Sequence, residues 1–238
     1  MNILITICAR GGSKGIPGKN VKLLDGHPVI GYTIKVAQKF AKKYDAFIGL
    51  STDSDEIRTV AEKLGVSTTY HRPAELANDS AGKMGAIQHL KEYEENRQNL
   101  TFDYVMDLDV SAPMRTFWDL EQAFEMLQNK PGAYNIFSAN AAARNPYFNM
   151  VEDAENGYVK LVKDAGEILS RQKAPKVYDM NASFYIFRKS FFDDQCKTST
   201  TSKSLVFEMS HLCFDLDEPI DFLFMEYLFS NKLLDFEI

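Results

Sequence analysis

A glycine-rich, cationic loop near the N-terminus is the segment whose residue types point most directly to chemistry. The loop spans residues 10–19, directly after the apolar run 3–8, and holds four glycines and the cations Arg10, Lys14 and Lys19. Glycines let the backbone approach a ligand and present consecutive N–H groups to an anion. Lys and Arg neutralise the charge of that anion. Because the whole chain is acidic, with net charge −6, this local gathering of cations predicts a polyphosphate site.

Two common phosphate loops do not match this glycine loop (residues 10–19). The P-loop pattern requires Gly where Ser13 stands and Ser or Thr where Asn20 stands, and the dinucleotide pattern G-x-G-x-x-G is absent. The alternative is a solvated strand–helix connection. The glycine loop follows the first buried strand, at the edge where α/β sheets bind ligands, and this position favours phosphate binding. We assign the following residues of this segment to nucleotide binding: Ala9, Arg10, Gly11, Gly12, Ser13, Lys19 and Asn20.

Two pairs of carboxylates follow apolar runs at a spacing of two residues: Asp107 with Asp109, and Asp215 with Asp217. Residues i and i+2 of a strand point to the same side. Two carboxylates beside a triphosphate indicate Mg²⁺, which prefers oxygen ligands. Asp217 has the alternative of capping the last helix, whereas Asp215 has none. We therefore predict Asp215 and Asp217 (the acid pair) as metal ligands, leave open whether Asp107 and Asp109 also bind metal, and assign Asp109 and Ser111 to the nucleotide.

Further polar residues lie at predicted strand ends. The triplet 51–53, Ser-Thr-Asp, fits helix capping and ligand contact about equally well. Asn181 lies inside the apolar run 180–187, where a buried amide must be hydrogen-bonded. We therefore predict that Asn181, together with Arg171 and Gln172 just before that run, contacts a ligand.

The elements that must position these residues alternate between strand and helix over the first 130 residues. This order predicts one α/β domain over 1–238, with a mostly parallel sheet covered by helices on both faces. The second half is richer in strands, and we interpret 144–178 as a β-rich insertion with a hairpin turn at Asn156-Gly157. Strands are predicted at 3–8, 45–50, 66–70, 102–108, 134–140, 148–152, 158–162, 178–187 and 212–216, and helices at 29–41, 55–64, 80–97, 117–129 and 218–231.

Composition excludes several classes of protein. No apolar run approaches the ~20 residues of a membrane span, and an acidic chain without an extended basic face makes nucleic acid an improbable partner. The N-terminus has no basic region before its apolar stretch, so no signal peptide is expected. The three cysteines lack metal-binding spacing and indicate reduced thiols. We expect a cytoplasmic protein.

The segment 9–20, Ala-Arg-Gly-Gly-Ser-Lys-Gly-Ile-Pro-Gly-Lys-Asn, resembles the opening signature of the acylneuraminate cytidylyltransferases, which activate sialic acids and related nine-carbon sugar acids with CTP. The resemblance covers essentially the whole chain, through 51–53, Arg72-Pro73, 76–79, 111–115 and 214–217. It implies a Rossmann-like nucleotide-diphospho-sugar transferase fold, Mg²⁺ as cofactor, and a homodimer formed through the small extension at 144–178. It also implies that Arg72 contacts the nucleotide.

The chain departs from the sialic-acid members at two motifs. Those members typically have Gln-Pro-Thr-Ser-Pro at 109–113 and Asn-Gly-Ala at 181–183, where this chain has Asp-Val-Ser-Ala-Pro and Asn-Ala-Ser. The combination of Asp-Leu-Asp with the segments 144–148 and 178–183 looks more like the branch that activates legionaminic acid. We assign the sugar acid to Arg115, Asn145, Tyr147, Phe148, Arg171, Gln172 and Asn181.

The predicted reaction is attack of the sugar's anomeric hydroxyl on the α-phosphorus of CTP, with release of pyrophosphate. Such a transfer depends on positioning and charge neutralisation, for which we select Arg10, Lys19 and Asp215 as catalytic residues. One alternative is activation of an eight-carbon sugar acid with CTP. The other is a nucleotide-binding regulator without chemistry, which would have no use for the acid pair.

Overall fold

The computed structural model describes residues 1–78, 82–164, 166 and 170–237. Its core is a six-stranded sheet with the strand order β10-β6-β9-β5-β1-β4. Strand β1 runs parallel to both neighbours, β10 is parallel to β6, and only β9 is antiparallel to the strands beside it. The predicted α/β class with a mostly parallel sheet is therefore confirmed. The strands are β1 (Ile3–Cys8), β4 (Phe47–Ser51), β5 (Tyr104–Leu108), β6 (Asn135–Ala141), β9 (Tyr178–Arg188) and β10 (Ser204–Glu208).

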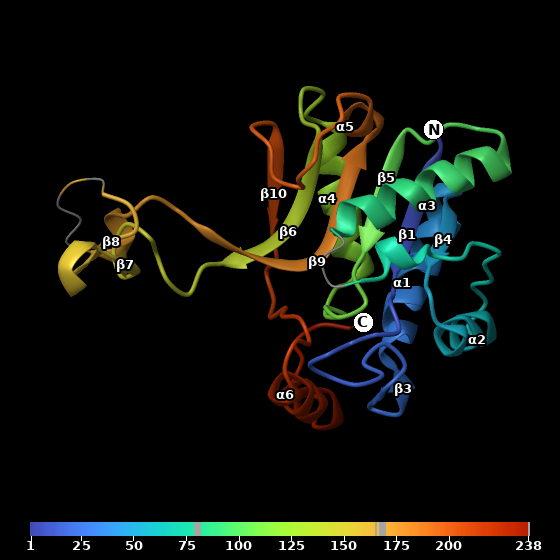
Figure 1. Cartoon of the computed structure of the whole chain (residues 1–238), viewed down its shortest axis with the longest axis horizontal. Coiled ribbons are helices and arrows are strands. Elements are labelled where there is room, and N and C mark those ends of the chain that lie inside the picture. The colour runs from blue at the N-terminus through green and yellow to red at the C-terminus, as the bar shows by residue number, and fades with distance from the viewer. Residues whose placement is uncertain (79–81, 165, 167–169, 238) are drawn as a thin grey trace.

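Helices cover both faces of this sheet (Figure 1). On one face, Ile3, Ile5 and Ile7 of β1 join the large core that α1 and α4 complete. On the other face, Val105 and Phe187 pack with Ile87 of α3. Burial on both sides explains why the strands are nearly continuous apolar runs. The helices are α1 (Val29–Tyr44), α2 (Asp55–Lys63), α3 (Lys83–Gln98), α4 (Phe117–Gln128), α5 (Lys189–Asp193) and α6 (Pro219–Ser230).

Local sequence signals set the helix boundaries. Helix α2 begins at Ser54, whose hydroxyl accepts from the Ile57 amide. Helix α4 begins with a capping box between Thr116 and Asp119, an arrangement that satisfies two otherwise unpaired donors. The helix predicted from residue 80 is described from Lys83 onward, because 79–81 lie outside the described residues. No described helix is long and apolar enough to cross a membrane.

Two predicted strands are wrong. The segments 66–70 and 212–216 are irregular, and their apolar residues reflect burial without strand pairing. Tyr70, for example, is buried and places its hydroxyl 2.9 Å from His89 Nδ1. The sequence analysis also missed β10, and a short hairpin of β2 (Leu23–Leu24) and β3 (His27–Pro28) around the turn Asp25-Gly26.

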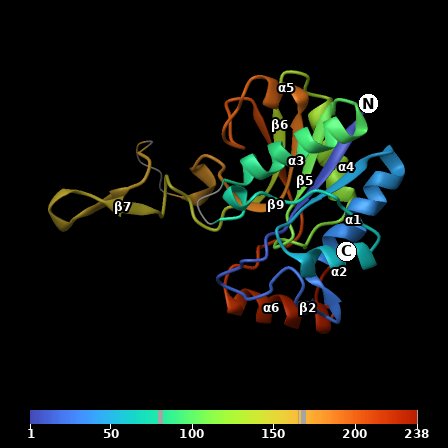
Figure 2. The same cartoon turned by 45° about the vertical axis from the view of Figure 1, so that its right-hand side comes forward.

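The predicted insertion at 144–178 projects from the body of the molecule, and we call it the arm (Figures 1 and 2). Its predicted hairpin is confirmed, with Asn156-Gly157 in the turn, although β7 (Val151–Asp153) and β8 (Val159–Leu161) are each three residues long. Apolar side chains on it are exposed, Tyr158 to 73%. The sheet strands β6 and β9 lead into and out of the arm.

Candidate functional site

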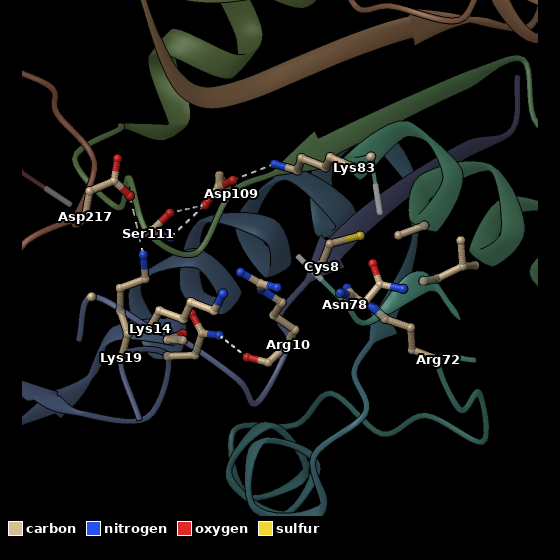
Figure 3. Close-up of a pocket in the computed structure, with 16 residues that line it drawn as sticks. Cys8, Arg10, Lys14, Lys19, Arg72, Asn78, Lys83, Asp109, Ser111 and Asp217 are labelled. Atoms are coloured by element: carbon tan, nitrogen blue, oxygen red, sulfur yellow. Dashed lines mark hydrogen bonds and ion pairs between the residues drawn. The ribbon is translucent and has the colours of Figure 1, made fainter. Parts of the chain in front are cut away.

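A polar cleft of about 370 Å³ opens where the glycine loop and the carboxyl ends of β1 and β5 meet the start of α3 (Figure 3). Five cations and two carboxylates line it, which makes it suited to an anionic ligand that also brings a metal ion. The lining residues are Cys8, Arg10, Ser13, Lys14, Gly15, Lys19, Asn20, Arg72, Leu76, Asn78, Gly82, Lys83, Ala86, Asp109, Ser111 and Asp217.

The glycine loop is fixed by hydrogen bonds from its own neighbourhood. The Gly11 amide donates to Asp53 Oδ1 at 2.8 Å, and the Ala9 amide donates to the Ser51 carbonyl. Asn20 donates from Nδ2 to the Arg10 carbonyl at 2.9 Å (Figure 3). Of the two interpretations of the triplet 51–53, capping is wrong because Ser54 caps α2. Asp53 instead anchors the loop that lines the cleft.

The glycine loop touches the segment of the acid pair through its backbone. A Cβ atom at Gly15 would lie 2.0 Å from the Asp217 carbonyl oxygen, so only glycine permits this approach. Lys19 donates to the Leu216 carbonyl, and its Nζ lies 3.8 Å from Asp217 Oδ1 (Figure 3). Two segments about 200 residues apart in the chain therefore form one wall of the cleft.

The two carboxylates of the acid pair differ in exposure and repel each other. Asp215 is half-buried, and the Asp217 side chain is 70% exposed. Burial raises the pKa of Asp215, and the adjacent Asp217 and then Asp109 raise it further. The capping alternative for Asp217 is wrong, because Asp221 accepts from the Asp217 and Glu218 amides at the start of α6.

These two carboxylates fit Mg²⁺ held jointly with a substrate. Among the described residues, no group of three or more His, Cys, Asp or Glu side chains could hold a metal ion. An all-protein cage is therefore lacking in that part of the chain. Mg²⁺ commonly binds through one or two carboxylates together with substrate phosphates and water. The acid pair supplies that number of protein ligands.

Lys83 is a charged cleft residue that the sequence analysis did not consider. Its Nζ lies 2.7 Å from Asp107 Oδ2 and 2.6 Å from Asp109 Oδ2. Both ion pairs outweigh burial and raise the pKa of Lys83. A lysine in the first turn of a predicted helix was the available signal, since a cation is unfavourable at that end of the helix dipole and requires a specific partner.

The carboxylates of Asp107 and Asp109 form hydrogen bonds and ion pairs within the protein. Asp107 is fully buried and accepts from Thr6 Oγ1 at 2.8 Å, and Asp109 accepts from the amide and hydroxyl of Ser111 at 2.7 Å each. Burial alone would raise the pKa of Asp109, but Lys83 and the Ser111 hydrogen bonds lower it to about 2. Asp109 thus lines the cleft as an ionised acceptor, while Asp107 faces the interior.

Arg72 and Cys8 also line the cleft. Arg72 is buried and donates from Nε to Ser51 Oγ at 2.8 Å and from Nη2 to the Ser51 carbonyl at 2.9 Å, which fixes the end of β4. Burial and then Asp107 raise the pKa of Cys8 to about 12. Cys8 is therefore a neutral thiol at physiological pH and a poor nucleophile.

Three residues predicted to contact the sugar acid are buried and hydrogen-bonded inside the protein. Arg115 is fully buried and donates to the carbonyls of Ser183 and Asp109 and to Thr33.

The amide of Asn181 accepts from Ser138 Oγ at 2.6 Å and donates to Asn140 Oδ1 at 2.7 Å. Asn145 accepts from the Tyr147 amide and donates to the Pro175 carbonyl at the base of the arm. The protein therefore holds all three side chains in place, and their contact with the sugar acid stays a prediction.

The other predicted sugar contacts lie on the arm. Tyr147, Phe148 and Gln172 belong to it, as does the short 3-10 turn that begins at Arg171, and the described cleft lining includes no arm residue. The fold of one chain therefore does not bring these residues to the cleft. The cleft lining does include seven of the residues predicted to contact the nucleotide: Arg10, Ser13, Lys19, Asn20, Arg72, Asp109 and Ser111.

The chain is similar in sequence to known proteins over nearly its whole length. A family model described as cytidylyltransferase matches residues 4–229. The chain is 39% identical over 232 residues to CMP-N,N'-diacetyllegionaminic acid synthase of Campylobacter jejuni, covering 98% of this chain and 97% of that protein. It is 38% identical over 233 residues to post-translational flagellin modification protein B of Campylobacter coli, with the same coverage.

A third relative is more distant. The pseudaminic acid cytidylyltransferase of Campylobacter jejuni is 30% identical, with 97% of each chain covered.

Solved structures share the fold. A CMP:2-keto-3-deoxy-manno-octonic acid synthetase complexed with CTP matches with a TM-score of 0.69 at 16% identity, covering 98% of this chain and 100% of that one. A 4-diphosphocytidyl-2C-methyl-D-erythritol synthase from Anaerococcus prevotii matches with a TM-score of 0.60 at 13% identity, covering 96% and 98%. The predicted Rossmann-like nucleotidyltransferase fold is confirmed.

Proposed function

This chain belongs to the cytidylyltransferase family, and from that premise we propose that it transfers CMP from CTP to a legionaminic-type nonulosonic acid and releases pyrophosphate. The observation that carries the proposal is the contact between Gly15 and Asp217. It brings the segment of the acid pair against the cationic glycine loop, and Asp217 lines the same cleft as that loop. A nucleotidyltransferase needs both, since it must neutralise a triphosphate and assist departure of pyrophosphate.

The glycine loop would bind the β- and γ-phosphates of CTP. Arg10, Lys14 and Lys19 line the cleft, and Asp53 holds the loop in place before any ligand arrives. Preorganised cations stabilise charge that develops on the leaving group without reorganising during the reaction. Lys19 also contacts the carbonyl of Leu216, so the loop and the acid pair keep a fixed relative position.

The acid pair would hold Mg²⁺, which supplies charge neutralisation of the triphosphate and lowers the pKa of a coordinated hydroxyl. Asp215 and Asp217 provide the carboxylates. The raised pKa of Asp215 reflects burial and then repulsion from Asp217 and Asp109, and a bound cation would relieve that repulsion. The Asp107–Asp109 pair would have no such role, because Lys83 already forms ion pairs with both of its carboxylates.

The choice of a legionaminic-type sugar rests on similarity. The relative named for N,N'-diacetyllegionaminic acid is 39% identical over nearly the whole chain, whereas a relative named for pseudaminic acid is 30% identical. The likeness to the eight-carbon-acid synthetase is one of fold at 16% identity. An apolar wall that reads the terminal methyl of legionaminic acid would reject the hydroxyl of sialic acid by only about 10².

The proposed enzyme acts as a homodimer through the arm. Tyr158, Val159 and Val151 are each exposed by 58% or more on a projecting hairpin. Exposed apolar patches of this kind are typical of protein interfaces, and a two-fold dimer is the commonest closed assembly. Sedimentation velocity should show a dimer mass that Tyr158→Asp and Val159→Asp reduce to that of a monomer. A wild-type monomer at all concentrations contradicts the arm's proposed role.

Pyrophosphate release from CTP and Mg²⁺ tests the function directly, with N,N'-diacetyllegionaminic, N-acetylneuraminic, pseudaminic and eight-carbon acids supplied in parallel. We expect the highest kcat/KM with N,N'-diacetyllegionaminic acid. A higher value with N-acetylneuraminic or the eight-carbon acid would replace the sugar assignment. CTP binding without pyrophosphate release for any sugar would favour the regulator.

A further inference from the structure

The histidine that opens the acid-pair segment is held in an unusual environment. His211 follows β10 and begins the segment 211–217, which ends at the acid pair. Its side chain is 7% exposed, as is typical of a core residue. Neither the predicted site nor the proposed reaction uses this residue.

Both ring nitrogens of His211 face hydrogen-bond acceptors. Nε2 lies 2.9 Å from Asp119 Oδ2, and Nδ1 lies 3.1 Å from the Leu212 carbonyl oxygen. A carboxylate and a carbonyl can only accept, so both nitrogens must carry hydrogen to satisfy both contacts. A neutral imidazole has one N–H and would leave one contact unmade. The two contacts together therefore favour the imidazolium form.

This imidazolium connects three parts of the chain. Asp119 lies in the first turn of α4 and also accepts from the amide and hydroxyl of Thr116, each at 2.7 Å. The ring of Phe236, from the C-terminal tail, stacks on His211 with centroids 3.8 Å apart. Asn140 of β6 donates to the His211 carbonyl at 3.0 Å. His211 thus joins α4, the tail and the sheet at one point.

The segment 211–217 is anchored at both ends. His211 holds its start, while at its far end the Leu216 amide donates to the Ser111 carbonyl at 2.8 Å and Lys19 donates to the Leu216 carbonyl. Asp215 lies between these two anchors. A shift at either anchor would therefore move the acid pair relative to the glycine loop.

We propose that His211 is a positioning residue whose imidazolium fixes the segment 211–217 and, through it, the acid pair. Loss of the proton breaks one of the two ring contacts and releases the start of the segment. The consequence for turnover rests on the proposed function. The consequence for the segment itself does not.

The charged and titratable groups around His211 set the pH range of this contact. Asp119 on α4 and Asp235 on the tail favour the imidazolium, Cys213 lies on the same segment, and Arg115 lies near Asp119. Burial alone would lower the pKa of His211, but the hydrogen bonds to Asp119 and Leu212 raise it above 6.5.

Burial alone would raise the pKa of Asp119, but hydrogen bonds from His211 and Thr116 lower it. The stabilising contribution of His211 is therefore complete below about pH 6.5, and it is lost as the pH rises through the raised value. At the acidic end, the contribution of Asp119 is lost as the pH falls through its lowered pKa.

NMR titration of the four histidines of the wild-type protein is the primary test, with His211→Gln used to assign the resonance. We expect His211 to titrate above pH 6.5, and Asp119→Asn to lower its pKa. A wild-type pKa at or below 6.5, or one that Asp119→Asn leaves unchanged, overturns the proposal. The wild-type titration decides even where a variant fails to fold.

Hydrogen exchange of the amides 213–217 tests the positioning role. Exchange, corrected for its intrinsic pH dependence, should accelerate in the wild type as the pH passes the His211 pKa, and should be fast at every pH in His211→Gln. The exposed His27 contacts the Asp25 carbonyl through Nδ1, so His27→Gln is the matched control and should behave as wild type. Exchange independent of the His211 proton would overturn the positioning role.

Turnover supplies the last readout. His211→Gln should raise the Mg²⁺ concentration for half-maximal pyrophosphate release on the order of ten-fold, the lower range for losing a group that orients metal ligands, with KM for CTP unchanged. An unchanged Mg²⁺ dependence contradicts the role in positioning the acid pair. An enzyme inactive with every sugar acid would refute the proposed function instead, while NMR and exchange still decide the role of His211.

Discussion

The two carboxylate pairs of this protein share a sequence pattern and differ in what surrounds them. Each pair has a spacing of two residues at the end of an apolar run. Asp107 and Asp109 are held by Lys83 at 2.7 and 2.6 Å, whereas Asp217 of the acid pair has Lys19 at 3.8 Å and is largely exposed. Both carboxylates of the first pair have an ion-pair partner within the protein, whereas the carboxylates of the second pair repel each other. Spacing alone therefore does not identify a metal site, because the neighbouring cations decide.

Removing charge from the acid pair should have the largest effect. We expect Asp215→Asn and Asp217→Asn each to lower Mg²⁺-dependent turnover by at least about 10³, with little change in melting temperature, since neither carboxylate is paired deep in the core. Pyrophosphate release and differential scanning fluorimetry measure the two effects. The exposed carboxylate Glu62 on α2 offers the control, Glu62→Gln. Wild-type turnover in Asp215→Asn would remove the contrast between the two pairs.

The cations of the glycine loop should rank next. We expect Lys19→Ala and Arg10→Ala each to lower kcat by roughly 10²–10³, comparable to losing one oxyanion donor. Lys39→Ala removes an exposed lysine from α1 and serves as the matched control. Near-wild-type rates in both folded loop variants would show that the loop only connects a strand to a helix.

Lys83→Met should affect mainly stability, unlike the acid-pair variants. It leaves two adjacent carboxylates without their cation, one of them fully buried. Breaking a buried ion pair costs about 3–5 kcal/mol, and urea unfolding at neutral pH should report a free energy of unfolding lower by that amount, with Lys39→Met as control. Adding Asp107→Asn should restore part of the loss. A stability unchanged in Lys83→Met would mean that the pair is not held by this lysine.

The pH dependence of the same pair follows from Asp109. Its pKa is about 2 in the folded protein, below the ~3.9 of an unfolded chain. Its contribution to wild-type stability is therefore complete above about pH 4 and is lost as the pH falls towards 2. In Lys83→Met, acid should instead reduce the destabilisation, because protonation removes the uncompensated charges.

The smallest expected effect comes from the backbone contact that joins the loop to the acid pair. Gly15→Ala would place a methyl group 2.0 Å from the Asp217 carbonyl and should lower kcat on the order of ten-fold by displacing the acid pair, since misplacement of about 1 Å can cost up to 10². Gly132→Ala introduces its methyl into open space and is the control. Equal rates in the two variants would contradict the fixed contact.

The sequence predicted cleft residues correctly where a polar, glycine-rich segment directly follows a buried strand. The glycine loop was predicted to form a ligand site and does line the cleft, because it follows the carboxyl end of β1 in a mostly parallel sheet. Asp217 was also predicted and lines the same cleft, but from irregular backbone. Segments buried without pairing were not predictable: 66–70 and 212–216 carry the apolar pattern of strands but contact the core from irregular backbone. Apolar patterning reports burial, and strand pairing depends on partners elsewhere in the chain.

Contacts between side chains far apart in the sequence were also not predictable. Lys83 meets Asp107 and Asp109 across 24 and 26 positions of chain, and no local pattern encodes that meeting. Arg115 and Asn181 stood out as polar residues beside apolar runs, and the structure pairs both inside the protein. The described arm residues do not line the cleft of their own chain. Their contacts with the sugar acid therefore remain a prediction.

A crystal of the protein grown with CTP and Mn²⁺, which substitutes for Mg²⁺ at oxygen ligands, tests the central contrast most directly. Anomalous difference density locates the ion without assuming any ligand. We predict a peak within coordination distance of both Asp215 and Asp217, and none at the Asp107–Asp109 pair beside Lys83. A peak at Asp107 or Asp109, with the acid pair left without an ion, would contradict the account.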